Sequence, residues 1–207
     1  NVFHYNAAIS ACGRGGEWQL ALATLVSMFD LQIAPTAISF NSAISAFEKS
    51  GRWQFALATL SKMAEVHVTP DVITYNSVFS ACEKGAQWLI TLAMLDTMTA
   101  SRITPDVISC NAIISACGTG GQWQIALAGL ATMAELRIPP DIISYSAGIS
   151  ACEKSGRWQS ALVLLGTMLK MHVRADVISL SATISACEKG GQWQVALSLL
   201  DAMTNMR

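Results

Sequence analysis

Four kinds of side chain recur together in this sequence, at spacings that place them on one face of a helix. One copy of the set consists of Ile73, Asn76, Ser80 and Lys84. At about 100° per residue, these four positions fall within roughly 80° of one another. On such a face an apolar group could contact a nucleobase, an amide could bond to the base edge, and a cation could neutralise a phosphate. This face is therefore the candidate for binding.

The same face recurs six times along the chain, with one break at Thr119, which takes the place of the basic residue. Asparagine forms helices poorly, so its four appearances early in a predicted helix favour a role in binding. Two alternatives stay open: the apolar column could pack against the adjacent copy, and the basic column could compensate charge at a helix end. The apolar column is Phe3, Ile38, Ile73, Ile108, Ile143 and Ile178; the polar column is Asn6, Asn41, Asn76, Asn111, Ser146 and Ser181; the basic column is Arg14, Lys49, Lys84, Lys154 and Lys189.

Six tryptophans give the length of the repeated unit, because each follows the previous one by 35 residues. They are Trp18, Trp53, Trp88, Trp123, Trp158 and Trp193. A period in this range predicts a solenoid in which each unit packs only on its neighbours. We therefore expect an all-α fold, a single α-solenoid of about six helix-turn-helix repeats over residues 1–207. The expected repeats are 2–36, 37–71, 72–106, 107–141, 142–176 and a truncated 177–207.

Each repeat is expected to contain two helices, which in the third repeat span residues 73–84 and 87–100. Glycine in the turn between them permits the left-handed geometry that ends a helix. The turn is Gly85-Ala86 in the third repeat, and Gly15-Gly16, Ser50-Gly51, Gly120-Gly121, Ser155-Gly156 and Gly190-Gly191 elsewhere. Proline precedes most first helices, and the aspartates that follow it stand at N-cap positions. These aspartates are either N-caps only or part of the binding face. The tryptophan and methionine columns of the second helix are expected in the core.

Composition excludes several classes of function. The chain carries 13 Lys and Arg against 14 Asp and Glu, a net charge of −1, so it is no strongly basic nucleic-acid binder and any affinity should be modest. No apolar run approaches about 18 residues, so membrane insertion is not expected. Five of the six cysteines share one column, too far apart for disulfides, which predicts free thiols. Neither a metal-ligand spacing nor a catalytic constellation is found, so we expect no metal, no cofactor and no enzyme activity.

A resemblance to a known family follows from the repeated motifs. The 35-residue period, with Asp-Val-Ile-Ser/Thr-Tyr-Asn, Gly-x-Trp-x-x-Ala-Leu-x-x-Leu-x-x-Met and Pro-Asp, resembles the pentatricopeptide repeat family over essentially the whole chain. The resemblance implies a right-handed superhelix that binds single-stranded RNA in an organelle, one base per repeat. It implies an adaptor for RNA processing, stability or translation, in the chloroplast rather than the mitochondrion. We expect any targeting peptide to lie upstream of Asn1.

In that family the amide or hydroxyl of the first helix and the last residue of the same repeat together choose the base. Asparagine with aspartate implies uracil and serine with aspartate implies guanine, so the implied core is 5′-UUUG-3′. The apolar column matches the family's base clamp, and the basic column matches its phosphate contacts. The implied pairs are Asn41 with Asp71, Asn76 with Asp106, Asn111 with Asp141 and Ser146 with Asp176, while Asn6 with Thr36 is irregular and Ser181 has no partner in the chain.

A second function stays open beside RNA binding. The chain could be a protein–protein scaffold or a structural subunit of a large organellar complex. Its low proportion of charged residues, 13%, and its high apolar content, 52%, favour such a role. The sequence therefore predicts single-stranded RNA as the main partner, with other organellar proteins as the alternative.

Overall fold

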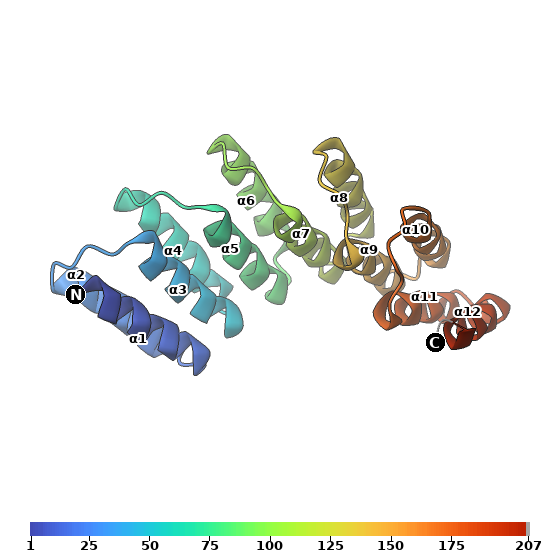
Figure 1. Ribbon diagram of the computed structural model, residues 1–207, viewed down its shortest axis with the longest axis horizontal. Helices are drawn as coiled ribbons and strands as arrows, with labels where there is room; N and C mark the ends of the chain where they lie inside the picture. The colour runs from blue at the N-terminus through green and yellow to red at the C-terminus, as the bar shows by residue number, and fades with distance from the viewer. Residues whose placement is uncertain (206–207) are drawn as a thin grey trace. The chain divides into compact units, whose positions relative to one another are not determined.

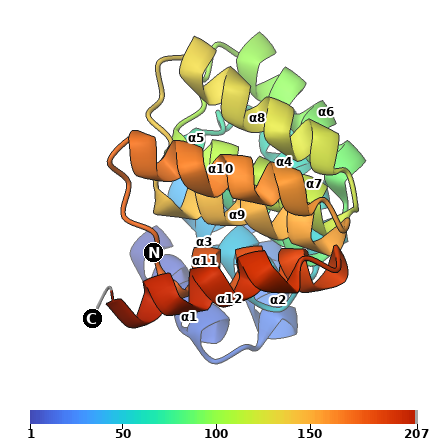
Figure 2. The same ribbon diagram turned by 90° about the vertical axis from the view of Figure 1, so that its right-hand side faces the viewer.

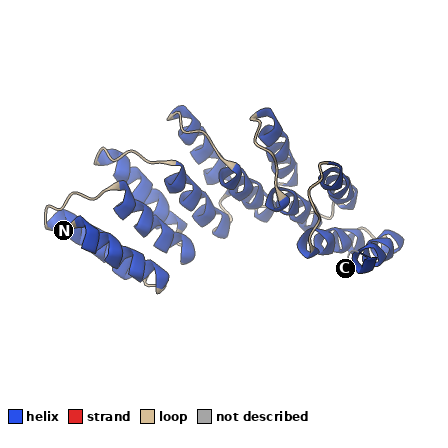
Figure 3. Cartoon of the chain, viewed as in Figure 1, coloured by secondary structure: helices blue, strands red, loops and turns tan. Residues whose placement is uncertain are grey.

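The computed structural model describes residues 1–205, which form twelve α-helices of thirteen residues each and no strand (Figures 1 and 3). This confirms the expected all-α fold of paired helices. The helices of the third repeat begin at Val72 and Trp88, each within one residue of its predicted start. The helices are α1 Val2–Arg14, α2 Trp18–Asp30, α3 Ala37–Lys49, α4 Trp53–Glu65, α5 Val72–Lys84, α6 Trp88–Ala100, α7 Val107–Thr119, α8 Trp123–Glu135, α9 Ile142–Lys154, α10 Trp158–Lys170, α11 Val177–Lys189 and α12 Trp193–Asn205.

The chain forms two compact units, Asn1–Pro105 and Asp106–Arg207. In the first unit the first helices α1, α3 and α5 pack side by side, and each also contacts the second helix of its own repeat (Figure 1). The second unit has the same internal order: α9 contacts both α7 and α11, and it also packs against α10 (Figure 2). In both units the first helices thus form one layer, and the binding face predicted from the sequence belongs to this layer.

The first helices begin at side-chain caps. Asp71 Oδ1 accepts a hydrogen bond of 2.8 Å from the Thr74 N–H, and the Thr74 hydroxyl in turn accepts one of 3.1 Å from the Asp71 N–H. This reciprocal capping box satisfies two backbone donors that a helix end leaves unpaired. The same arrangement starts α7, α9 and α11 at Asp106, Asp141 and Asp176. The predicted N-cap role of the aspartates is therefore confirmed.

The turn between the two helices of a repeat contains the predicted left-handed glycine in five repeats and differs from the prediction in the third. The five glycines, with φ between 66° and 79°, are Gly16, Gly51, Gly121, Gly156 and Gly191. In the third repeat the left-handed residue is Ala86, with φ 53°, whereas Gly85 has an ordinary φ of −86°. Gly85 is required for space instead, because a Cβ placed there would lie 2.3 Å from Trp53 Cδ1. Gly190 approaches Trp158 in the same way. The tryptophan of one repeat therefore packs beneath the turn of the next.

The core contains the methionine column, as predicted, and the tryptophans pack at its edge, as Trp158 does. Met28, Met63, Met98, Met133 and Met168 are fully buried, whereas the first five tryptophans are only half-buried and Trp193 is 64% exposed. All six cysteines are free thiols, as expected. Burial raises the pKa of the Cys82, Cys117 and Cys152 thiols to about 11, so these groups stay protonated and unreactive at neutral pH.

The turn at residues 85 and 86 gives a matched pair of substitutions. Ala86→Gly should stabilise the protein by about 0.5–1 kcal/mol, because glycine adopts a positive φ without the strain that alanine carries. Gly85→Ala should destabilise it by about 1–3 kcal/mol, because the new methyl group overlaps the Trp53 ring. Urea denaturation followed by circular dichroism measures both changes. The opposite order of stability would contradict this account of the turn.

Candidate nucleic-acid interface

The apolar column of the first helices faces solvent. Its six side chains are between 59% and 73% exposed, with Ile143 the least and Phe3 the most exposed. The larger part of each of these residues is therefore not packed against the adjacent repeat. Phe3, Ile38, Ile73, Ile108, Ile143 and Ile178 take the same place near the start of successive first helices. A regular column of exposed apolar groups marks an interaction surface.

In the first unit this column borders a hollow of 340 Å³ formed by α1, α3 and α5. Its lining includes Ile38, Ile73, Asn41, Ser45 and Lys49. The structure thus brings an apolar pair, the polar residue of the second repeat, a serine and a basic residue to one place, as the helical spacing predicts. Apolar walls with a few convergent polar groups are typical of a ligand site.

The Asn41 amide is held by the beginning of the next repeat. Asn41 Nδ2 donates a hydrogen bond of 3.3 Å to Asp71 Oδ1, and the Thr74 hydroxyl lies 2.7 Å from Asn41 Oδ1. The predicted pair of Asn41 and Asp71 is therefore in direct contact. Burial raises the pKa of Asp71, but the hydrogen bonds from Thr74 and Asn41 outweigh it and hold the pKa below its ordinary value of 3.8. The aspartate is charged at neutral pH.

The second unit repeats this arrangement at Asn111, which is only 9% exposed. Its Nδ2 donates a hydrogen bond of 3.1 Å to Asp141 Oδ1, and the Ser144 hydroxyl lies 2.5 Å from its Oδ1. Burial raises the pKa of Asp141, and the hydrogen bonds from Ser144 and Asn111 again bring the net pKa below the ordinary value. Asn76 belongs to the first unit and Asp106 starts the second, so this predicted pair falls on two separately described units.

The remaining predicted pairs differ. Asn6 Oδ1 accepts a hydrogen bond of 2.6 Å from Ser39, whose hydroxyl also accepts one from the Thr36 N–H. Ser146 Oγ is buried and has no hydrogen-bond partner among the described residues. The Ser146 side chain is one bond shorter than that of asparagine. Asp176 caps α11, and Ser181 is exposed on that helix.

The basic column divides into two kinds of residue. Lys84 Nζ lies 3.1 Å from Glu48 O and 3.3 Å from Glu48 Oε1 of the preceding repeat, and Lys189 Nζ lies 2.5 Å from Glu153 Oε1. Ser80 and Ser185 donate to the same two glutamates. The hydrogen bond from Lys189, its charge and the Ser185 hydroxyl together lower the pKa of Glu153 despite partial burial. Lys84 and Lys189 are therefore already paired across repeats.

Glycine takes the place of this glutamate in the first and fourth repeats, at Gly13 and Gly118. A Cβ at Gly118 would lie 2.9 Å from the Ala151 Cβ, so the neighbouring first helices approach closely there. Lys49 and Lys154 follow these glycine repeats, and within residues 1–205 neither forms an ion pair with the preceding repeat. Arg14 is exposed at the end of α1. Among the described residues, the charges of Arg14, Lys49 and Lys154 are therefore not neutralised by an ion pair with another repeat.

The partners that hold the amides and the lysines were not predicted from the sequence. Each glutamate is 36 residues before its lysine, one repeat and one residue away, and each amide-holding hydroxyl is 33 residues after its asparagine. Both spacings are visible in the sequence once the first helices are known to be neighbours. The Asp-x-x-Ser/Thr pattern of the capping box also marks the hydroxyl.

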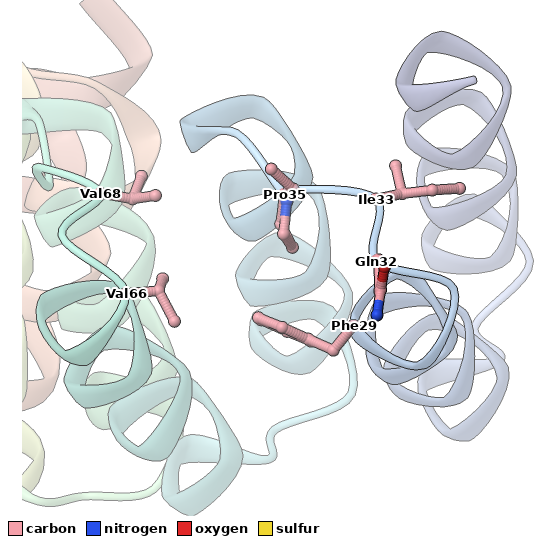
Figure 4. A pocket seen from close by; sticks show the side chains of 7 residues that line it. Phe29, Gln32, Ile33, Pro35, Val66 and Val68 are labelled. Atoms are coloured by element: carbon pink, nitrogen blue, oxygen red, sulfur yellow. The ribbon is translucent and has the colours of Figure 1, made fainter.

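A different hollow of 290 Å³ lies between the loops that end the first two repeats (Figure 4). Its walls come from Phe29, Ile33, Pro35, Val66 and Val68, with Gln32 as the polar side chain. With no charged group in its lining, this hollow offers no ion pair to a phosphate. Among the described residues no His, Cys, Asp and Glu side chains cluster to hold a metal ion, and no helix is long and apolar enough to cross a membrane.

Comparisons with known proteins identify the family. The sequence matches the family described as pentatricopeptide repeat-containing protein over residues 7–133, and the family described as PPR repeat over residues 143–173 and 178–207. The first match alone covers more than half of the sequence, so the chain belongs to the pentatricopeptide repeat family. Comparison with curated proteins gave no match.

Solved structures share the fold. The pentatricopeptide repeat protein PPR10 from maize is 25% identical with a TM-score of 0.82, and the match covers 100% of this chain and 30% of PPR10. PPR10 in complex with an 18-nt psaJ RNA element is 24% identical with a TM-score of 0.71 over 99% of this chain and 28% of PPR10. The PPR domain of protein-only RNase P 1 from Arabidopsis thaliana, in complex with tRNA, is 12% identical with a TM-score of 0.72 over 87% of this chain and 95% of that domain. These likenesses confirm an α-solenoid of about six repeats.

The charged caps should make stability depend on pH. Because the folded-state pKa of Asp71 is lowered, its stabilising contribution is present above about pH 4 and is lost as the pH falls through that lowered pKa. Asp71→Asn removes this titration, so its urea midpoint should lie below that of the unsubstituted protein at pH 7, and the two midpoints should converge as the pH falls through the lowered pKa. Asp30→Asn, which removes an exposed carboxylate outside the network, is the control. A constant difference for Asp71→Asn at every pH would refute the charged-cap interpretation.

Proposed function

We propose that this chain binds single-stranded RNA along the exposed face of its first helices. The observation that carries the proposal is the hollow in which Ile38 and Ile73 meet the Asn41 amide and the unpaired Lys49. Exposed apolar side chains can contact the faces of bases that single-stranded RNA leaves unstacked. The amide reaches a base edge, and the lysine stands at the other end of the same face, where a phosphate can bind.

The proposal extends to sequence specificity, with one base per repeat. Asparagine paired with aspartate selects uracil and serine paired with aspartate selects guanine, which gives 5′-UUUG-3′ from the second repeat to the fifth. Family membership and the direct hydrogen bonds from Asn41 to Asp71 and from Asn111 to Asp141 support this assignment. Complexes of PPR10 and of the RNase P domain with RNA support the ligand class.

We further propose an adaptor that acts without a catalytic step of its own, in an organelle and by preference the chloroplast. Family resemblance supports both points. The chain spans only 30% of the length of PPR10. A role in RNA processing, stability or translation is therefore part of this proposal.

The deciding experiment is selection from a randomised RNA pool, repeated across salt concentrations. The bound fraction should be enriched in uridine at three consecutive positions followed by guanosine. Its affinity should fall moderately with salt, because few cations are free. Binding with neither sequence preference nor salt dependence would falsify the proposal.

Base selection should follow the polar column. Asn111→Thr should move the third base of the core from uracil toward guanine, so that UUGG gains on UUUG, with a mismatch costing about 1–3 kcal/mol. The preference at the first base, read by Asn41, should stay as it was and serves as the internal control. If the variant binds both RNAs as the unsubstituted protein does, Asn111 is structural.

Lysines without an ion pair should contribute more to RNA binding than lysines that are paired with a glutamate. Lys49→Ala should weaken binding and flatten the slope of log affinity against log salt by about 0.7, the loss of one phosphate contact to a single strand. Glu48→Gln should have the opposite effect, because it removes the carboxylate charge that neutralises Lys84. Glu17→Gln is the control. It changes the net charge by the same amount, but Glu17 lies just before α2, away from the first-helix face. Equal gains from both glutamine variants would assign the effect to net charge alone.

A protein–protein scaffold remains the second candidate function, and one feature favours it. An apolar hollow of 420 Å³ lies beside α2 and α4, lined by Leu22, Leu25, Val26, Phe40 and Phe55 among others. Exposed apolar residues also occur on other second helices, including Leu89 and Val163. Co-purification from the native organelle with stoichiometric proteins and no RNA would favour the scaffold over RNA binding.

A further inference from the structure

We propose that the hydroxyl at the third position of a first helix orients the base-selecting amide of the preceding repeat. Thr74 acts in this way on Asn41, and Ser144 acts on Asn111. This inference rests on the proposed RNA binding and adds a positioning residue to each of these two sites. The hydroxyls do not reach the base themselves, because Thr74 and Ser144 are fully buried.

The position of the hydroxyl proton follows from its neighbours. Thr74 Oγ1 lies 2.7 Å from Asn41 Oδ1 and 2.8 Å from Asp71 Oδ1. Asp71 Oδ1 already receives the Thr74 N–H and the Asn41 amide N–H. Asp71 Oδ1 keeps these two donors whichever way the hydroxyl proton points, whereas in the described part of the chain the Thr74 hydroxyl is the donor that the structure shows for Asn41 Oδ1. The hydroxyl therefore donates its single proton to the amide oxygen.

The hydroxyl–amide contact occurs three times among the described residues, at Thr74, Ser144 and Ser39, and at Thr74 and Ser144 it is accompanied by a carboxylate. The hydroxyl oxygen lies 2.5 Å from the amide oxygen at Ser144 and 2.6 Å from it at Ser39. At Ser144, as at Thr74, the amide oxygen is closer than the carboxylate oxygen, which lies 2.9 Å away. At Asn41 and Asn111 a carboxylate accepts on one side of the amide and a hydroxyl donates on the other, so a flipped amide would place its oxygen against the carboxylate oxygen. The network therefore fixes one orientation of the asparagine.

A fixed amide has a consequence for base choice. With Oδ1 occupied and one N–H committed to the aspartate, the amide keeps a free N–H to offer to a ligand. The uracil O4 carbonyl accepts such a hydrogen bond, whereas cytosine has an amino group at the same position. An amide that could turn would present its oxygen to that amino group equally well. The hydroxyl thereby converts a general polar contact into discrimination between uracil and cytosine.

The fifth repeat supplies the contrast. Ser146 stands in place of the asparagine, and its Oγ has no hydrogen-bond partner in the described part of the chain. The third-position hydroxyl there, Ser179, instead donates a hydrogen bond of 3.0 Å to the Asp176 carbonyl oxygen. The hydroxyl therefore turns to the backbone where there is no amide to hold. Ser179 performs the capping function without the orienting one.

The test compares affinities for short RNAs that differ at one base of the UUUG core. Thr74→Val keeps the shape of the side chain and removes the hydroxyl. It should reduce the preference for UUUG over CUUG by about threefold to tenfold, the loss of one neutral hydrogen bond. Ser144→Ala should reduce the preference for UUUG over UUCG by a similar factor. Each variant should keep the preference at the position that the other controls.

Two controls separate orientation from capping. Thr74→Ser retains the hydroxyl and should restore the preference at the first base. Ser179→Ala removes the equivalent capping hydroxyl where there is no amide, and should leave the preference for UUUG over UUUA unchanged. Circular dichroism verifies that each variant is folded.

The outcomes are distinct. If the unsubstituted protein does not prefer UUUG to CUUG, the proposed base selection itself fails. If it does, and Thr74→Val retains the full preference or weakens both RNAs equally, then Thr74 only caps α5 and the inference is overturned. Loss of the preference in Thr74→Val, its retention in Thr74→Ser and an unaffected Ser179→Ala would support the inference.

Discussion

A hydrogen-bonded contact between consecutive repeats is the interaction on which the rest of this structure depends. The aspartate that begins a first helix caps that helix and accepts the amide N–H of the preceding repeat, as Asp71 does for Thr74 and Asn41. One carboxylate thus sets where a helix starts, joins two repeats and holds a polar group of the exposed face. Capping the helix and holding the amide are therefore not alternatives for this residue, because the same oxygen atom, Oδ1, accepts both hydrogen bonds.

The ion pairs between first helices recur with a period of three repeats, not one. The pair of Lys84 with Glu48 recurs 105 residues later as Lys189 with Glu153, and Gly13 recurs as Gly118 at the same distance. Each unit of three repeats therefore has its own bridging pair and its own unpaired lysine, Lys49 or Lys154. Lysines that neutralise glutamates contribute to the contact between repeats and add little to the attraction of an anionic ligand. Under the proposed function, apolar contact and hydrogen bonding must supply most of the affinity.

The helix pairs and several residues of the candidate site could be predicted from the sequence, because a strict period shows the same pattern in every repeat. The tryptophan spacing predicts the helix pairs to within one residue in the third repeat, and the helical spacing brings Ile38, Asn41 and Lys49 to one hollow. The pattern alone could not decide whether the isoleucines were buried, since an apolar column suits both a core and a binding face. It also could not assign Gly85, whose space is needed by a tryptophan of the preceding repeat. Features that depend on the packing between repeats required the structure.

The central claim is that RNA lies on the exposed first-helix face. Nuclear magnetic resonance of the protein with labelled isoleucine methyl groups, titrated with UUUG RNA, tests this most directly. The account predicts contacts between the exposed Ile38 and Ile73 methyl groups and uracil ring protons, with no such contact for Ile44, which is fully buried in α3. RNA contacts confined to the second helices, with the exposed isoleucine methyl groups unaffected, would contradict it.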